Sequence, residues 1–428
     1  MSEPHGRPAG LSPYDGLVAR ASALDTGDPL APLRDRFMLD PAGPAVPAGP
    51  ADPAQDGNGT VYLDGNSLGA LSTGVLPRLT DVVNREWGEL RIRSWEESGW
   101  WTAPERIGDR IAPLVGAAPG QLVVGDSTSV NVFKALVAAV RMAPAERTEI
   151  LVDADTFPTD GYIAASAARL TGHTLRPVPA AGIAAAAGPQ TAAALVNHVD
   201  YRTGRLHDLA AVTAALHAAG ALAVWDLCHS AGALPVALDA AGADLAVGCT
   251  YKYLNGGPGA PAYLYVRRDL QPRFDSPLPG WNSHADPFGM AGDFQPAQGA
   301  PRGRVGTPEI LSLLALDAAL DVWDGVDLAE VRAKSLALTD FFLECVAALV
   351  PAGRVASVTP QAHAERGSQV SLRCADAGKV MGELTARGVV GDYRRPDLLR
   401  FGFTPLYTRY ADALRAARVL ADVIEGTA

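Results

Sequence analysis

Short apolar runs alternate with longer amphipathic runs along most of this chain. From residue 61 the apolar runs include VYLD, QLVVGD and EILVDAD, and the helix-like runs LPRLTDVVNREWGEL and VNVFKALVAAVRM lie between them. Further apolar runs, AALVNHVD, ALAVWD, DLAVGCT and AYLYV, follow in the same way. Strands separated by helices form a mostly parallel sheet with helices on both faces. We therefore predict a large α/β domain over residues 61–308.

The pattern changes after residue 308. Two long helical runs, LSLLALDAALDVWDGV and LAEVRAKSLALTDFFLECVAALV, precede strand-like runs near 369–372 and 399–403. This order predicts a smaller α+β domain over residues 309–428. Residues 1–60 are expected to form an N-terminal arm, in which the Pro/Ala-rich stretch 41–59 is an irregular insertion.

The net charge of the chain argues against a nucleic-acid partner. There are 36 Lys and Arg against 47 Asp and Glu, which gives a formal charge of -11. Nucleic-acid binding needs clustered positive charge, which this sequence lacks. No apolar stretch reaches the roughly eighteen residues of a membrane-spanning helix, and the N-terminus has no signal-peptide core. We expect a cytoplasmic protein that acts on a small molecule, with no nucleic-acid or membrane partner.

Cysteine and histidine positions argue against a metal site. The four cysteines show no CxxC spacing, and the eight histidines show no HxxxH or HExxH pairing. Each cysteine lies in an apolar run, so we expect buried free thiols rather than zinc ligands or disulfides. The cysteines are Cys228, Cys249, Cys345 and Cys374.

Candidate chemistry gathers at the predicted strand ends, where ligands bind in parallel α/β sheets. Thr128 and Ser129 open a helix after QLVVGD, and such a start suits a phosphate, although an ordinary helix cap has the same sequence. Phe157 follows EILVDAD, Asp226 ends ALAVWD, and Lys252 follows DLAVGCT before the stretch NGGPG. A lysine at a strand end can act as a Schiff-base nucleophile, although most lysines are simply solvated.

Taken together, these features match the needs of pyridoxal 5'-phosphate. The helix start would take the phosphate, and Phe157 would stack on the pyridine ring. Asp226 would keep the ring nitrogen protonated, and Lys252 would form the Schiff base. Each feature alone has a structural explanation, but their order along successive strand ends predicts a pyridoxal-phosphate enzyme.

Nine short motifs also carry a family resemblance. They are YLDGNSLG at 62–69, SWEESGW at 94–100, TSVN at 128–131, FPTD at 157–160, DLCHSAG at 226–232, YKYLN at 251–255, PGW at 279–281, VGTP at 305–308 and RFGFTPLY at 400–407. Together they resemble the kynureninases, which have the aspartate-aminotransferase-like fold of pyridoxal-phosphate enzymes (fold type I). The resemblance covers nearly the whole chain after about residue 60 and implies a homodimer with shared active sites.

The resemblance gives each matching position a role. The cofactor would be held by Thr128, Ser129, Phe157, Asp160, Asn197, Asp226, His229, Tyr251 and Lys252 of one subunit and by Trp281 and Thr307 of the other. Lys252, Tyr251 and Asp226 would be the catalytic residues. The substrate would be bound by Arg400 at its α-carboxylate, by Trp95 beside its aromatic ring, and by Asn66 at the mouth of the site.

The implied reaction is hydrolytic Cβ–Cγ cleavage of L-kynurenine to anthranilate and L-alanine, a step of tryptophan catabolism. Lys252 would remove the Cα proton, and Tyr251 would relay protons. Trp95 and Thr307 would make a mostly apolar slot for the ring, so we expect L-kynurenine to be preferred over 3-hydroxy-L-kynurenine. A ring-hydroxylated or otherwise modified kynurenine is the alternative substrate.

Other interpretations differ in the chemistry they need. The first alternative is another enzyme of the same fold, either a desulfurase or an aminotransferase. A desulfurase needs a reactive cysteine in a polar loop. A serine hydrolase is another, because GNSLG around Ser67 fits the pattern G-x-S-x-G, but it leaves Asp226, Lys252 and Arg400 unexplained. A non-catalytic binding protein would not need a Schiff-base lysine.

Overall fold

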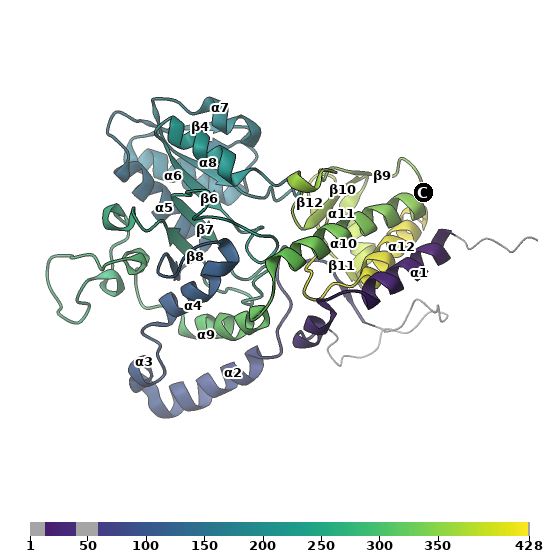
Figure 1. Ribbon diagram of the computed structural model, residues 1–428, viewed down its shortest axis with the longest axis horizontal. Coiled ribbons are helices and arrows are strands. Elements are labelled where there is room, and N and C mark those ends of the chain that lie inside the picture. The colour runs from purple at the N-terminus through teal and green to yellow at the C-terminus, as the bar shows by residue number, and fades with distance from the viewer. Residues whose placement is uncertain (1–12, 40–58, 427–428) are drawn as a thin grey trace, which may run out of the picture.

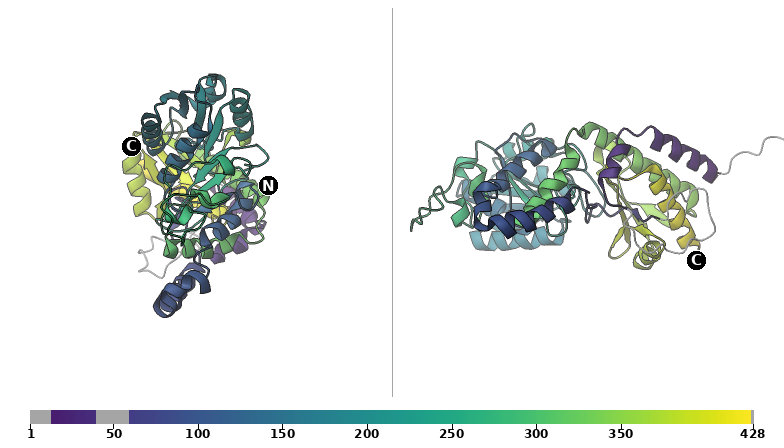
Figure 2. Two further views of the ribbon diagram at one scale, coloured as in Figure 1. Left: turned by 90° about the vertical axis from the view of Figure 1, so that its left-hand side faces the viewer. Right: turned by 90° about the horizontal axis from the view of Figure 1, so that it is seen from below.

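The computed structural model describes residues 13–39 and 59–426. These residues form two lobes that lie side by side, one around a seven-stranded sheet and the other around a four-stranded sheet (Figures 1 and 2). The predicted insertion at 41–59 lies almost entirely outside the described residues. Among the described residues, no helix has both the length and the apolar character needed to cross a membrane.

The seven-stranded sheet is mostly parallel, which agrees with the predicted α/β class. Its strand order is β2-β8-β7-β6-β5-β3-β4, and only β8 runs antiparallel to its neighbours. The strands are β2 (Leu122–Val124), β3 (Glu149–Asp153), β4 (Thr174–Val178), β5 (Thr191–Asn197), β6 (Leu222–Asp226), β7 (Leu245–Gly248) and β8 (Tyr263–Val266). Because β3, β5, β6 and β7 run in one direction, their carboxyl ends meet at one edge of the sheet.

Helices cover both faces of this sheet, as predicted. Successive strand residues point to opposite faces, so Ala223 and Trp225 of β6 pack into one apolar cluster and Val224 packs into another. The first cluster also contains residues of α4 (Ala103–Ile111), α7 (Ile183–Ala186), α8 (Leu209–Ala218) and α9 (Ile310–Ala319). The second contains residues of α5 (Thr128–Met142) and α6 (Pro158–Thr171). Strands buried on both faces explain why the runs are almost wholly apolar.

The second lobe is built on the antiparallel sheet β12-β13-β10-β9. Its strands are β9 (Val355–Ser357), β10 (Gln369–Cys374), β12 (Asp392–Arg394) and β13 (Leu398–Gly402), and its helices are α10 (Leu328–Leu349), α11 (Ala377–Ala386) and α12 (Tyr410–Gly426). Helix α1 (Pro13–Thr26) packs against α12, and β1 (Val61–Tyr62) pairs in parallel with β11 (Val389–Val390). Helix α1 and β1 therefore belong with the C-terminal lobe, whereas Leu30 and Phe37 of the arm pack into the apolar cluster of the first lobe.

Packing favours different limits for the two domains from those we predicted. Val61 and Leu63 are buried in the apolar cluster of the second lobe. Leu313 and Leu316 of α9, with Trp323 after it, are buried in the cluster of the first lobe. A division at the start of α10 fits these contacts better than the predicted one at 308/309. The division itself stays a prediction.

The remaining segments are short, apart from one long helical arm. The predicted helix LPRLTDVVNREWGEL is α2 (Val75–Asp81) continued by a π-helix (Val82–Leu90), and α3 (Ser94–Glu97) follows. The 3-10 segments are Ala31–Arg36, Arg91–Arg93, Ala112–Val115, Ala180–Gly182, Gln271–Arg273, Trp281–Ser283, Ala300–Gly303, Leu320–Trp323 and His363–Glu365.

Candidate active site

A cavity of about 240 Å³ lies at the carboxyl ends of the parallel strands, and we call it the strand-end cavity. It is lined by Thr128, Ser129, Phe157, Thr159, Asp160, Asn197, Val199, Tyr201, Asp226, Cys228, His229, Tyr251 and Lys252. Nine of these residues are the ones that the sequence predicted for one subunit's share of the cofactor site. The structure therefore brings together residues that are up to 124 positions apart (128 to 252).

The floor of the strand-end cavity is acidic. Strands β5 and β6 pair Asn197 with Asp226 in register, and the Asn197 amide donates to Asp226 Oδ2 and to Asp160 Oδ2, each at 3.1 Å. Burial and the Asp226 charge raise the pKa of Asp160 well above its usual range. Asp160 therefore keeps a proton at neutral pH.

The surroundings of Asp226 test whether the site suits a pyridine ring. Its carboxylate is buried, and its partners among the described residues are the Asn197 amide, the Cys228 backbone N–H at 2.6 Å and the Asp160 carboxyl. None of these is a cation. Since a buried carboxylate is costly without one, the position fits a protonated ring nitrogen.

Lys252 extends into the same cavity. Its Nζ lies 2.9 Å from His229 Nε2 and 5.8 Å from the centre of the Tyr251 ring. Burial and the Lys252 charge lower the pKa of His229 well below its usual value, so a neutral His229 accepts a hydrogen bond from the ammonium. The amine is thus held inside the cavity, unlike that of an ordinary solvated loop lysine.

The phosphate end of the predicted site lies at the start of α5. Ser127 is the N-cap of the helix, and its Oγ accepts from the Val130 N–H at 3.4 Å. A second cavity of about 290 Å³ adjoins this turn and shares Thr128 and Tyr251 with the strand-end cavity. Two hydroxyl side chains and a helix N-terminus beside a cavity suit an anionic phosphate.

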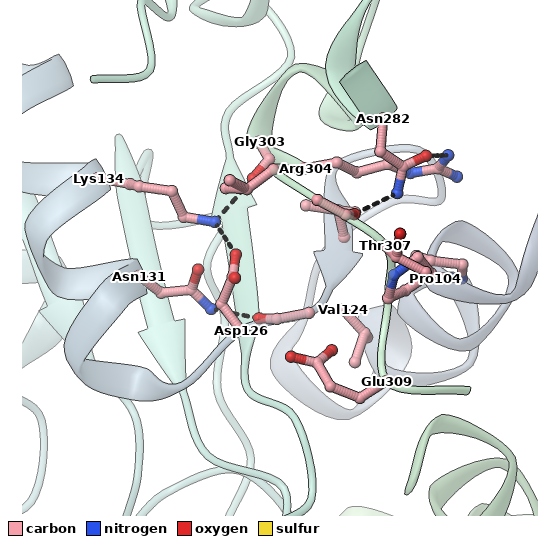
Figure 3. Close-up of a pocket in the computed structure, with 15 residues that line it drawn as sticks. Pro104, Val124, Asp126, Asn131, Lys134, Asn282, Gly303, Arg304, Thr307 and Glu309 are labelled. Carbon is pink, nitrogen blue, oxygen red and sulfur yellow. Dashed lines mark hydrogen bonds and ion pairs between the residues drawn. The ribbon is translucent and has the colours of Figure 1, made fainter. Parts of the chain in front are cut away.

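A buried lysine that the sequence did not single out holds this turn in place (Figure 3). Lys134 is 1% exposed, and its Nζ donates to Asp126 Oδ2 and to the Gly303 carbonyl, each at 2.7 Å. Asp126 has a positive φ of 57°, which a non-glycine residue adopts only at a cost. The Lys134 contact offsets that cost and fixes the backbone just before Ser127.

Tyr251 keeps its proton at neutral pH. The neighbouring Cys249 and burial raise the pKa of the Tyr251 phenol. All four cysteines are free thiols, as predicted, but Cys228 is only half-buried and lines the strand-end cavity. The prediction that every cysteine is buried is wrong for Cys228, which lies in the turn after β6, beyond the end of the strand, and lines the strand-end cavity.

Five predicted residues do not line the strand-end cavity of this chain: Trp95, Trp281, Thr307, Arg400 and Asn66. Thr307 lines the separate pocket of Lys134 and Asp126 (Figure 3). Trp95 packs against Trp100, with ring centres 5.9 Å apart, and the Trp281 ring lies 5.6 Å from that of Trp101. That Trp281 and Thr307 serve a neighbouring subunit stays a prediction.

Charged residues of the second lobe gather beside the strand-end cavity. This arginine cluster consists of Asp64, Ser67, Asp392, Arg394 and Arg400. Arg400 is 1% exposed on β13, and its Nε donates to Asp392 Oδ1 at 2.7 Å, while its Nη2 also contacts Asp392. Burial alone would raise the pKa of Asp392, but Arg400 and Arg394 lower it below its usual value. Asp392 is therefore an ionised partner for both guanidinium groups.

Tyr201 connects the arginine cluster to the strand-end cavity. It lies in a tight hairpin closed by the bridge between Val199 and Leu206. Its ring lines the cavity and meets the Phe157 ring edge-on at 5.2 Å, while its backbone carbonyl accepts from Arg400 Nη1 at 2.5 Å. This hydrogen bond holds the Arg400 guanidinium at the edge of the cavity.

Asn66 and Ser67 occupy the turn after β1. Asn66 is fully buried, and its side-chain amide has no hydrogen-bond partner among the described residues. Ser67 Oγ donates to Asp392 Oδ2 at 2.8 Å and accepts from Arg400 Nη2 at 3.3 Å. Neither partner is a histidine that could activate a nucleophile, so the geometry argues against the serine-hydrolase interpretation.

Several residues of the site were missed in the sequence. Thr159, Val199, Tyr201 and Cys228 line the strand-end cavity, and Asp392 pairs with Arg400. The motifs FPTD and DLCHSAG contain two of them, so a search of all motif positions would have found Thr159 and Cys228. Tyr201 acts through its carbonyl contact with Arg400 of the other lobe, and Asp392 pairs with Arg400 across the neighbouring strands β12 and β13. The local sequence reveals neither contact.

Comparison with known proteins identifies the family. The profile of the kynureninase C-terminal domain matches residues 331–420. A kynureninase of Deinococcus radiodurans is 50% identical over 414 residues, which cover 95% of this chain and 96% of that protein. A kynureninase of Burkholderia pseudomallei strain 1106a is 46% identical over 412 residues, which cover 95% of each chain.

Two solved structures of other proteins resemble this chain in fold. The cysteine desulfurase CsdA of Escherichia coli superposes with a TM-score of 0.75 at 18% identity, covering 92% of this chain and 98% of that one. A mutant of C-DES with glycine linked covalently to its pyridoxal-phosphate cofactor gives a TM-score of 0.73 at 19% identity, covering 88% and 99%. At these identities the likeness shows the fold alone, and it confirms the predicted fold type I. With its full-length relatives at 46–50% identity, this chain belongs to the kynureninase family.

Proposed function

We propose that this protein is a kynureninase that uses pyridoxal 5'-phosphate to hydrolyse L-kynurenine to anthranilate and L-alanine. The observation that carries the proposal is the buried, cation-free Asp226 carboxylate facing the same cavity as Lys252. Membership of the kynureninase family supports the choice of reaction among those that such a site can perform.

The residues of the strand-end cavity would hold the cofactor at three points. Asp226 would bind the protonated ring nitrogen, and Phe157 would pack on the ring. Thr128, Ser129 and Tyr251 would bind the phosphate at the start of α5. When bound to Lys252, pyridoxal phosphate supplies an electron sink for the charge that develops at the substrate Cα.

Lys252 and Tyr251 are the groups we assign to proton transfer. Lys252 Nζ would accept the Cα proton once the substrate has displaced it, and neutral His229 would remain as its hydrogen-bond partner. Water adds to the substrate γ-carbonyl, and the Cβ–Cγ bond then breaks. Since Tyr251 keeps its proton at neutral pH, its hydroxyl can donate a proton during this cleavage.

The substrate would lie between the two lobes. Arg400 would bind the α-carboxylate through its guanidinium, which the Tyr201 carbonyl holds at the edge of the cavity. Asn66 lies in the adjacent turn with an unsatisfied amide. We expect these residues to hold the amino-acid end of the substrate beside Lys252.

We further propose a homodimer in which each subunit completes the other's site. Trp281, Phe288 and Met290 are exposed apolar residues of one loop, and Trp281 and Phe288 both pack against Trp101. A contiguous aromatic surface of this kind is typical of an interface. A partner's Trp281 and Thr307 would then reach the cofactor phosphate, and Trp95 would flank the substrate ring.

A location in the cytoplasm also remains a proposal. The cysteines of this chain are free thiols, as is usual in a reducing compartment.

The reaction can be tested directly. The purified protein with pyridoxal phosphate is incubated with L-kynurenine, and anthranilate and alanine are measured; we expect the two products in equal amounts. L-cysteine serves as the parallel substrate, and release of sulfide without anthranilate formation from L-kynurenine would favour a desulfurase instead. Lys252→Ala is the matched control for turnover that does not depend on the site.

A further inference from the structure

Most of the donors of Arg400 are already used by the protein itself. A guanidinium has five N–H groups. The Nε–H and one Nη2–H go to Asp392, a second Nη2–H goes to Ser67 Oγ, and one Nη1–H goes to the Tyr201 carbonyl. One N–H is left. A carboxylate bound at two oxygens needs a second donor from another residue.

Arg394 is placed to supply that donor. It lies on β12 two residues after Asp392, and side chains two residues apart on a strand share a face. Its Nη2 lies 2.9 Å from Asp392 Oδ2, the oxygen that Arg400 Nη2 also contacts. Asp392 thus holds both guanidinium groups from one carboxylate.

Fewer N–H donors of the Arg394 guanidinium have a partner than those of Arg400. Its Nε is buried and has no hydrogen-bond partner among the described residues, whereas its side chain as a whole remains 37% exposed. A buried, unsatisfied donor is unfavourable unless a ligand or water completes it.

Contacts within the arginine cluster connect Arg394 to the strand-end cavity, because Asp392 also binds Arg400, and Arg400 Nη1 donates to the carbonyl of the cavity residue Tyr201. Burial lowers the pKa of Arg394, and so does the charge of Arg400 beside it. His229 lines the cavity, and after burial and Lys252 its lowered pKa also reflects the charges of Arg400 and Arg394. Two positive groups close to one cavity residue favour an anionic ligand between them.

We propose that Arg394 is the second arm of the substrate carboxylate site, so that the α-carboxylate of an amino acid bridges the free donors of Arg394 and Arg400. The proposal rests on the proposed function for the identity of the substrate, but it requires only that the site takes an α-amino acid. Asp392 is then a positioning residue that sets the distance between the two arms.

The chain offers a matched control for this proposal. Arg395 is the next residue, is exposed, and donates from its Nε to the Tyr393 hydroxyl at 3.3 Å. Arg394→Gln and Arg395→Gln therefore remove the same charge from adjacent positions. Thermal unfolding and cofactor content would show that both variants fold and hold pyridoxal phosphate. Arg394→Lys provides a second variant that keeps the charge.

Binding is measured on the holoenzyme by calorimetry, with L-alanine and with L-alaninamide, which lacks the carboxylate. We expect Arg394→Gln to weaken L-alanine binding about tenfold or more, as for loss of a hydrogen bond to a charged group, and to leave L-alaninamide binding unchanged. Arg395→Gln should change neither by more than about twofold, and Arg394→Lys should recover part of the loss.

An equal loss for both ligands would overturn the proposal, because it would mean that Arg394 only supports the structure. Unchanged L-alanine binding in Arg394→Gln would overturn it as well. Since L-alanine binding needs no turnover of L-kynurenine, a wild-type protein inactive on L-kynurenine but with Arg394-dependent L-alanine binding would reject the proposed reaction and retain this inference.

Discussion

The strand-end cavity and the arginine cluster are neighbours, but the chain builds them in different ways. The cavity residues follow successive strands of one sheet, and each is positioned by its own strand or by the helix after it. The arginine cluster joins Ser67, after β1, to Asp392 and Arg400, which lie more than 300 positions later. The cavity therefore depends on local structure, whereas the cluster depends on contacts within the second lobe between segments far apart in the sequence.

The largest effect is expected at Lys252, in the strand-end cavity. Lys252→Ala should remove nearly all turnover, by about a thousandfold or more, because no other amine lines this cavity among the described residues. Borohydride reduction of the wild-type holoenzyme followed by peptide mapping should find the cofactor on Lys252. Finding it on another lysine would contradict the assignment.

Asp226→Asn tests the acidic floor of the cavity. The amide is nearly the same size but cannot hold the ring nitrogen protonated as a carboxylate does. We expect cofactor to remain bound while kcat falls about a hundredfold or more. A visible spectrum and steady-state kinetics measure both effects, and turnover within a few-fold of the wild type would reject the role.

Arg400→Leu tests the arginine cluster. It removes the donor nearest the cavity and leaves Asp392 without its main partner, so we expect a loss of about 2–5 kcal/mol in substrate binding, seen as a raised KM. Cofactor affinity, measured by titration of the apoprotein, should change much less. Arg395→Leu is the exposed control, and an unchanged KM for Arg400→Leu would move the carboxylate site elsewhere.

A smaller effect is expected where the proposed partner subunit enters. The double change Trp95→His and Thr307→Asn should shift preference toward 3-hydroxy-L-kynurenine, since polar groups would replace a mostly apolar slot. Burying the 3-hydroxyl of the substrate without a hydrogen-bond partner should cost about 1–3 kcal/mol, or roughly ten- to a hundredfold in relative kcat/KM. Competition of the two substrates in one reaction measures the ratio. If the wild type already prefers the hydroxylated substrate, the prediction of an apolar slot is wrong.

The smallest effect concerns Asp64, in the arginine cluster. Burial and the Asp392 charge raise the pKa of Asp64 to about 6. A raised carboxyl pKa favours folding below the unfolded value near 4, and this contribution is lost as the pH rises through about 6. Asp64→Asn should therefore raise Tm by roughly 2–4 °C at pH 8, and the gain should vanish by about pH 4.

Thermal unfolding from pH 4 to pH 8 checks this, with the exposed Asp155→Asn as control. A gain that is the same at every pH would show that Asp64 contributes by packing and not by charge.

The same contrast explains what the sequence could predict. The alternation of apolar and amphipathic runs was sufficient for the large sheet, because β3, β5, β6 and β7 are each buried on both faces. The strand ends then led to Asp226 and Lys252. The antiparallel direction of β8 was not predicted, since its run AYLYV has the composition of its parallel neighbours.

The sequence did not predict contacts between residues that lie far apart along the chain. Arg400 was predicted by resemblance, but its pairing with Asp392 depends on the register of β12 and β13, and its contact with Tyr201 depends on how β13 lies against the first lobe. The position of α9 was missed for a similar reason. A mostly apolar helix such as α9 can pack in either lobe, and only the tertiary structure shows that it joins α4.

The hydrogen bond from Arg400 to the Tyr201 carbonyl has a consequence for how this protein can change over evolutionary time. A main-chain oxygen is present whatever side chain stands at position 201, so substitutions there leave the contact in place. A change in the length of the hairpin would displace it, because Val199 and Leu206 fix both ends and the Gly204 carbonyl accepts from the Gly367 N–H at 2.7 Å. The Arg400 contact should therefore survive a replaced residue at position 201 far better than an insertion or deletion in this hairpin.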